Sequence, residues 1–115
     1  MTGQSFERAI QLLLLDPLGM DRTFFFAVDA ISYRCAVGHV SFDEGPRVSR
    51  PWTAGRSTHP FAGMISCTRD LLRWARFHLS DGTAPDGTRL LWPETLAYMQ
   101  SPLAPAGSPV TLTTT

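Results

Sequence analysis

The sequence contains no lysine and no asparagine, and all ten of its basic residues are arginine. A lysine amine can lose its proton and act as a base, whereas an arginine guanidinium stays protonated in proteins. These 115 residues therefore cannot by themselves supply a lysine that takes up the proton of an attacking serine. The stretch Ser5-Phe6-Glu7-Arg8 has the serine spacing of such a site, but it ends in arginine.

Cysteine is also scarce, because Cys35 and Cys67 are the only two in the chain. They form no C-x-x-C pair, and the three histidines do not have a spacing that places metal ligands on one face of an element. We expect two separate, largely buried thiols, no metal site and no cofactor. A disulfide between the two cysteines is an open alternative, and the sequence does not fix the redox compartment.

Long apolar runs and an excess of one charge are absent as well. The runs Leu12–Leu15 and Phe24–Val28 are far shorter than the ~20 residues that cross a bilayer. We therefore expect no membrane span, and the N-terminus lacks the pattern of a secretory signal. Ten basic residues balance ten acidic ones, so charge gives no reason to expect nucleic acid as a partner. The length of 115 residues and the hydrophobic content of 43% fit at most one globular domain.

The clearest pattern that is present runs from Ala62 to Leu79, where a glycine turn leads into an amphipathic helix. Ser66 and Thr68 can both cap a helix N-terminus, and Asp70 puts negative charge in the first turn. The pattern predicts a helix that begins near Thr68 and stops at Asp81-Gly82. The basic residues opposite its apolar face, interpreted as a solvated strip, are Arg69, Arg73 and Arg76.

A second helix is expected from about Gln4 to Leu15, with an unusually broad apolar face. Such breadth suggests contacts on more than one side, including contact with something outside this chain. Pro17 should forbid continuation of this helix, because proline lacks the N–H and its ring clashes with the preceding turn. We interpret Thr23, which follows, as a buried hydroxyl with its hydrogen bonds satisfied.

The connection from Phe24 to Phe61 shows no helical period and is interrupted by glycines and prolines. We expect an irregular loop with at most short extended pieces, at Phe24–Val28 and from Tyr33 toward His39. Connections of this length are unusual in compact domains and tend to be lids or binding loops.

A third helix is expected from about Pro93 to Gln100, after a turn at residues 85–88. Its inward residues should be Trp92, Leu96 and Met99. Prolines and a threonine-rich end follow, so residues 103–115 are expected to form a frayed tail.

Three of these stretches resemble the class C β-lactamase-like serine hydrolases, a family that includes penicillin-binding DD-peptidases and esterases. Residues 62–74, AGMISCTRDLLRW, are similar to the family's GG-(L/M)-x-S-T-x-x-D-L-x-R-(W/F). TGQSF at residues 2–6 and PLGMDRT at residues 17–23 are similar to T-G-x-x-F and P-L-G-M-x-x-T. Residues 90–99, LLWPETLAYM, are similar to L-L-S-P-E-T-L-x-x-M. The departures from these motifs, Ala62 for glycine, Cys67 for threonine and Trp92 for serine, include two lost helix caps that cost about 1 kcal/mol each.

The resemblance implies a mainly α fold, namely the helical subdomain segment of the α+β β-lactamase/DD-peptidase-like fold, with three helices and a long irregular loop. It implies a partial β-lactamase-related domain at residues 1–102. In the family, S-x-x-K and Tyr-x-Asn lie before the matched part, and the Lys/His-Thr-Gly strand lies after it. The family's loop helps to wall the substrate cleft, so Tyr33 and Trp52 are candidate substrate-binding residues. Anchoring of the loop to the helices by Trp52 is at least as good an interpretation.

Three hypotheses of function remain, and no catalytic residue is assigned in the first two. The first, which we prefer, is a fragment of a serine hydrolase that is inactive alone. Its partner would be the remainder of the parent domain, and the parent would hydrolyse a small-molecule β-lactam, peptide or ester through an acyl-serine. The second is a small helical module that binds a partner through the apolar face of the first helix. The third is a self-sufficient hydrolase built on Ser66, Asp70 and a histidine, although Ser66 lacks the G-x-S-x-G elbow.

Overall fold

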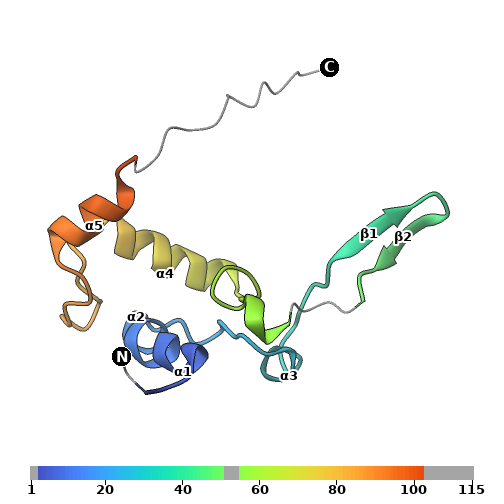
Figure 1. Ribbon diagram of the computed structural model, residues 1–115, viewed down its shortest axis with the longest axis horizontal. Helices are drawn as coiled ribbons and strands as arrows, with labels where there is room; N and C mark the ends of the chain where they lie inside the picture. The colour runs from blue at the N-terminus through green and yellow to red at the C-terminus, as the bar shows by residue number, and fades with distance from the viewer. Residues whose placement is uncertain (1–2, 51–54, 103–115) are drawn as a thin grey trace.

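The computed structural model describes residues 3–50 and 55–102, with helical segments toward both ends and a β-hairpin between them (Figure 1). The elements in chain order are α1 (Phe6–Ile10), the π-helical turn η1 (Gln11–Leu15), α2 (Asp16–Leu18), α3 (Ala27–Ala30), β1 (His39–Phe42), β2 (Gly45–Val48), the 3-10 turn η2 (Arg56–Thr58), α4 (Thr68–His78) and α5 (Pro93–Gln100).

The first helix is longer than predicted, because α1, η1 and α2 follow one another without a break through Pro17. The prediction that Pro17 forbids continuation is wrong for a local reason. Proline removes the hydrogen bond to the carbonyl four residues back, and η1 already replaces that pattern with bonds spanning five residues. The N–H of Asp16 accordingly bonds to the carbonyl of Gln11. The helix ends at Gly19, whose φ of 67° is left-handed.

The predicted helices at the other end of the chain are confirmed. α4 begins at Thr68, and α5 spans Pro93–Gln100 as expected. Leu96 of α5 is buried as predicted, but Trp92 and Met99 are 68% and 50% exposed. Those two predictions are wrong because so short a helix reaches the core through little more than one side chain.

One hydrophobic core joins the helices. α2 packs against α4, and α5 closes the far end of the same cluster. The buried residues of this core are Leu15, Leu18, Met20, Phe77, Ala84 and Leu96.

The predicted fold class, mainly α with three helices and a long irregular loop, is wrong. β1 and β2 form a two-stranded antiparallel sheet in register from His39 opposite Val48 to Phe42 opposite Gly45. The two helical segments α3 and η2 also lie within residues 24–61, where we expected irregular structure.

The glycine and proline that predicted interruptions of regular structure, Gly45 and Pro46, are both compatible with this hairpin. Two residues, Asp43 and Glu44, connect the strands, and Gly45 takes a φ of 110° directly after them. Pro46 is tolerated because both strands of a two-stranded sheet are edges. The extended piece expected at Phe24–Val28 is reduced to a single bridge between Phe24 and Ile65.

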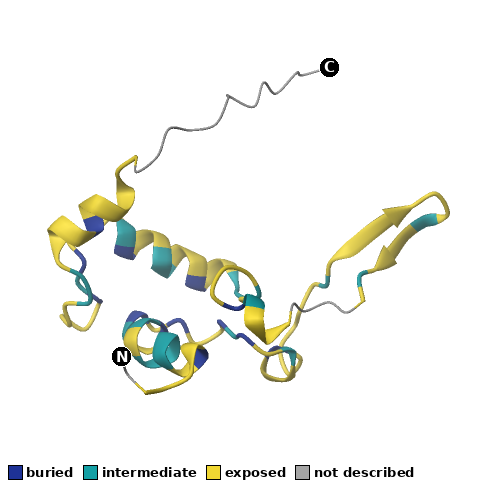
Figure 2. Ribbon diagram, viewed as in Figure 1, coloured by how far each residue is buried: buried dark blue, intermediate teal, exposed yellow. Residues whose placement is uncertain are grey.

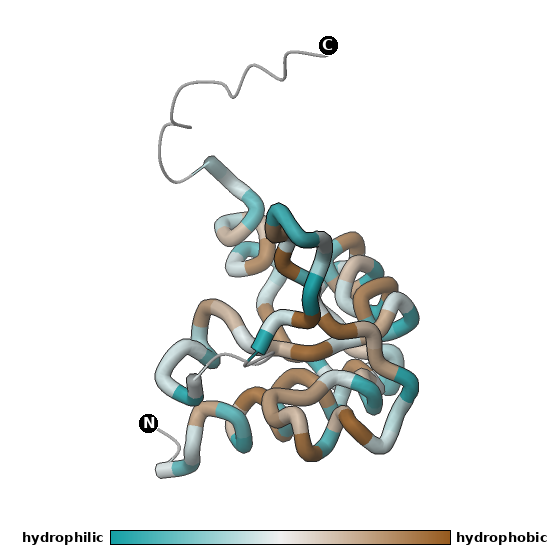
Figure 3. The backbone as a smooth tube through the Cα atoms, turned by 90° about the vertical axis from the view of Figure 1, so that its right-hand side faces the viewer, coloured by the Kyte–Doolittle hydropathy of each residue, from teal (hydrophilic) through white to brown (hydrophobic). Residues whose placement is uncertain are grey.

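The described chain is open in shape. The hairpin projects away from the helices, and every residue of its strands is exposed or half-buried (Figure 2). Hydrophobic residues are spread over several segments of the described chain (Figure 3). The radius of gyration is 17.6 Å, against about 13 Å for a compact domain of about 100 residues. Among the described residues, no helix has the length and apolar character needed to span a bilayer.

Candidate functional site

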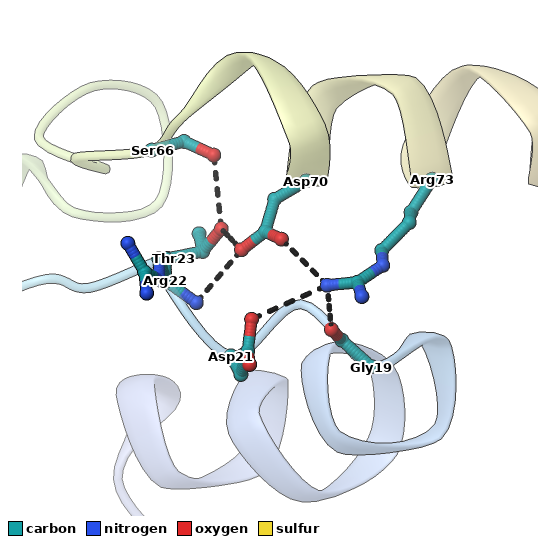
Figure 4. Close-up of polar contacts among 7 residues, drawn as sticks. All are labelled: Gly19, Asp21, Arg22, Thr23, Ser66, Asp70 and Arg73. Atoms are coloured by element: carbon teal, nitrogen blue, oxygen red, sulfur yellow. Dashed lines mark hydrogen bonds and ion pairs between the residues drawn. The ribbon is translucent and has the colours of Figure 1, made fainter.

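A buried carboxylate joins the two best-predicted motifs. Asp70, in the first turn of α4, is fully buried. Its Oδ2 accepts hydrogen bonds from the backbone N–H of Arg22 at 2.8 Å and from the hydroxyl of Thr23 at 2.9 Å, and its Oδ1 accepts one from Arg73 at 2.9 Å (Figure 4). We call this group, with the residues that complete it, the Asp70 cluster: Gly19, Asp21, Arg22, Thr23, Ser66, Asp70 and Arg73.

Ser66 lies at the edge of the Asp70 cluster. It does not cap α4, contrary to the prediction, because the residue at the N-cap position is Cys67. Phe24 and Ile65 exchange two backbone hydrogen bonds of 2.8 Å, which sets their two segments side by side. The hydroxyls of Thr23 and Ser66 therefore meet at 2.9 Å. Because Thr23 donates its one proton to Asp70, Ser66 is the donor to Thr23. The interpretation of Thr23 as a buried, satisfied hydroxyl is confirmed, since it is 2% exposed.

Arg73 belongs to the Asp70 cluster and not to a solvated strip. Its Nη1 bonds to the carbonyl of Gly19, to Asp21 Oδ1 at 3.2 Å and to Asp70. The guanidinium therefore balances the buried charge of Asp70 and ties α4 to the end of α2.

The three histidines have partners away from Ser66. His39 Nδ1 contacts the carbonyl of Val37, His59 contacts Glu7, and His78 contacts Gln100. Ser66 and Asp70 are consequently joined through Thr23 and not through an imidazole base.

A second buried carboxylate, which the sequence analysis did not single out, holds α1 to η2. Glu7 accepts two hydrogen bonds from Arg56, at 2.8 and 3.0 Å, and contacts His59 Nδ1 at 2.8 Å. His59 is buried, with the rings of Phe25 and Phe26 each 5.3 Å from its own. The hydrogen bonds from Arg56, and then those from backbone and His59, hold the pKa of Glu7 far below its ordinary value of 4.5.

Of the two candidate substrate-binding residues, Tyr33 lines a small cavity and Trp52 lies outside the described residues. The ring of Tyr33 stacks on Phe24 with centroids 5.2 Å apart, and the guanidinium of Arg22 lies 5.3 Å from its centre. The cavity has a volume of about 70 Å³ and is also lined by Ser66 and both cysteines.

A larger cavity lies elsewhere, between α2, α4 and the turn after α4. It has a volume of about 410 Å³, and Arg73, Arg76 and Phe77 are among its lining residues. Within residues 3–50 and 55–102, no three His, Cys, Asp or Glu side chains gather as metal ligands would.

Comparison with known proteins finds a family model, a relative in sequence and a relative in fold. The family model described as Beta-lactamase matches residues 1–115. Penicillin-binding protein 4 of Amycolatopsis lactamdurans is 34% identical over 106 residues, which is 90% of this chain and 28% of that protein. The solved octameric penicillin-binding protein homologue from Pyrococcus abyssi matches in fold with a TM-score of 0.67 and 23% identity, over 87% of this chain and 21% of that one. The chain thus spans 28% of the length of the first relative and 21% of the second.

Proposed function

Because the chain belongs to the β-lactamase family, we propose that it is the helical region of an acyl-serine hydrolase and is inactive on its own. The parent enzyme would attack the carbonyl of a small β-lactam, peptide or ester. The remainder of the parent domain would be the partner of this chain, and residues 1–102 would be the part that packs against it.

The observation that carries the proposal is the presence of apolar residues on two opposite sides of α4. Phe77 faces the core and is 3% exposed. The opposite side carries an apolar row that we call the outer stripe, made of Leu71, Leu72, Ala75 and Leu79. Its leucines are 55%, 60% and 89% exposed. Burying one leucine is worth about 1.5–3 kcal/mol, so the outer stripe favours a further layer of protein over α4.

The proposed inactivity rests on the inventory of proton-handling groups. The chain has no lysine that could activate a serine. Ser66, at the edge of the Asp70 cluster, donates its proton to Thr23, and the three histidines have their contacts with other residues. The nucleophile and its base would come from the remainder of the domain, and Tyr33 with Trp52 would contribute to the wall of the substrate cleft.

A chimera tests this function. The segment of Penicillin-binding protein 4 that this chain matches would be replaced by this chain, and covalent labelling by a fluorescent penicillin would be measured. We expect labelling of the chimera and none of the isolated chain. Leu72→Glu in the outer stripe should abolish labelling of the chimera, whereas Arg69→Glu, on the exposed polar side of α4, should preserve it.

Two outcomes would contradict the proposal. Labelling of the isolated chain at a serine would show that it carries its own chemistry. A folded chimera without labelling would instead favour the alternative, a helical module that binds a partner and has no catalytic role. That alternative draws support from Leu13 of the first helix, which is 60% exposed.

A further inference from the structure

The two cysteines, far apart in sequence, line one small cavity. Cys35 follows α3, and Cys67 directly precedes α4. Both belong to the wall of the cavity of about 70 Å³ that also includes Tyr33 and Ser66. A space of that size holds only a few water molecules, so the two thiol-bearing residues border one confined space.

Two contacts hold the cysteines in place. The backbone bridge between Phe24 and Ile65 fixes the segment that leads to Cys67, two residues further on. The stack of Tyr33 on Phe24 fixes the segment that leads to Cys35, also two residues further on. Since Phe24 takes part in both contacts, the two segments are positioned against the same residue.

Both thiols are free to react. The Cys35 S–H donates to the carbonyl of Ala30 at 3.0 Å, and the Cys67 side chain makes no capping hydrogen bond to α4. Cys35 is exposed and Cys67 is half-buried, and neither is in a disulfide. Cys35 is thus the more accessible of the two thiols to a small reagent.

We propose that Cys35 and Cys67 form a reactive dithiol that closes to an intramolecular disulfide by exchange with a low-molecular-weight disulfide. The sulfur of Cys35, after losing its proton, attacks one sulfur of the reagent, whose S–S bond breaks and releases one thiol. The sulfur of Cys67 then attacks Cys35 and releases the second thiol. Two protein thiols are oxidised, one reagent disulfide is reduced, and the two protons end on the released thiols.

The cross-link would join the chain after α3 to the start of α4. Everything between them, including the projecting hairpin of β1 and β2 and the turn η2, becomes a closed loop. The disulfide would therefore hold both ends of this loop at the wall of the Tyr33 cavity. Formation of this disulfide does not depend on the function proposed above.

Peptide mapping tests the proposal. The 115-residue chain, at low concentration, is equilibrated with reduced and oxidised glutathione, alkylated, digested with trypsin and analysed by mass spectrometry without reduction. Trypsin cleaves here only after arginine, so Cys35 falls in peptide 35–47 and Cys67 in peptide 57–69. We expect the linked pair of these peptides in monomeric protein, with an equilibrium constant at least about tenfold higher than in concentrated urea.

The variants Cys35→Ser and Cys67→Ser serve as matched controls, because each should yield only a glutathione adduct on the remaining cysteine. Three results would overturn the proposal: glutathione adducts on both cysteines without the linked pair, a linked pair found only in dimers, or the same equilibrium constant with and without urea.

Discussion

Two buried carboxylates hold this chain together, and they do so with different kinds of partner. Asp70 is bonded by a backbone N–H, a hydroxyl and one guanidinium, so two of its three donors are neutral and fixed by the fold. Glu7 is bonded by a guanidinium that is largely exposed and by a histidine. Asp70 is therefore a structural junction, whereas the contact of Glu7 with Arg56 and His59 depends on charge.

Removing the Asp70 carboxylate should have the largest effect. Asp70→Ala leaves the N–H of Arg22 and the hydroxyl of Thr23 without their acceptor, at a cost of about 1–3 kcal/mol for each group, and removes one of the three acceptors of Arg73. Amide hydrogen exchange in α4 and at Arg22 should accelerate more than ~100-fold. Asp70→Asn keeps one acceptor oxygen and should lie between this variant and the unmodified chain. Unchanged protection of α4 in Asp70→Ala would contradict the role of Asp70 as a junction.

Glu7→Gln should weaken the structure less, since Arg56 can regain its hydration in water. The effect should be confined to α1 and η2, with faster exchange at Arg56–His59 and little change in α4. The comparison would fail if Glu7→Gln loosened α4 as much as Asp70→Asn does, because the two sites would then form one unit.

Lowering the pH should distinguish the Glu7 site from the Asp70 cluster. The folded state depresses the pKa of Glu7, so the stabilisation from this group is present above its ordinary pKa of 4.5 and is lost as the pH falls below that value. Hydrogen exchange at η2, corrected for its intrinsic pH dependence, should therefore rise below that pH. Glu7→Gln should remove this response, and Asp70→Asn should retain it. An equal response in Glu7→Gln would assign the effect to another group.

The smallest effect is expected at the outer end of the Asp70 cluster. Ser66→Ala removes one hydrogen bond to Thr23 and leaves the two bonds of Asp70 to Thr23 and Arg22 intact, which costs about 1 kcal/mol. Exchange at Arg22 should rise less than ~10-fold, and penicillin labelling of the chimera should persist. Loss of labelling in a folded Ser66→Ala chimera would give Ser66 a chemical role.

Helix positions were predictable where the local pattern is strong. Periodicity and the turn at Asp81-Gly82 located α4, and Pro93 located the start of α5. The hairpin was not predictable from its pattern, because its strands are short and exposed on both faces, and only β1 alternates polar and apolar residues, while β2 begins with Gly45-Pro46.

The sites were predictable only in part. Thr23 and Asp70 were each identified as polar positions with a structural role, but nothing in the sequence says that they bond to each other across the chain. Glu7 falls within the predicted first helix, and a carboxylate on a helix usually meets water. Its partners Arg56 and His59 lie in a segment whose glycines and prolines predicted irregular structure in place of η2. No local signal in the sequence therefore indicated that Glu7 contacts these two residues.

The π-helical turn η1 has a geometric consequence for the first helix. Each residue of an α-helix advances about 100° around the axis, so a five-residue ring accommodates one extra residue and rotates everything after it by about that angle. Leu15 and Leu18 are buried in the core, with Ile10 and Leu14 packed against it, while Leu13 is 60% exposed. One continuous helix thus carries apolar side chains on a buried side and on an exposed side, and can lie between two neighbours at once.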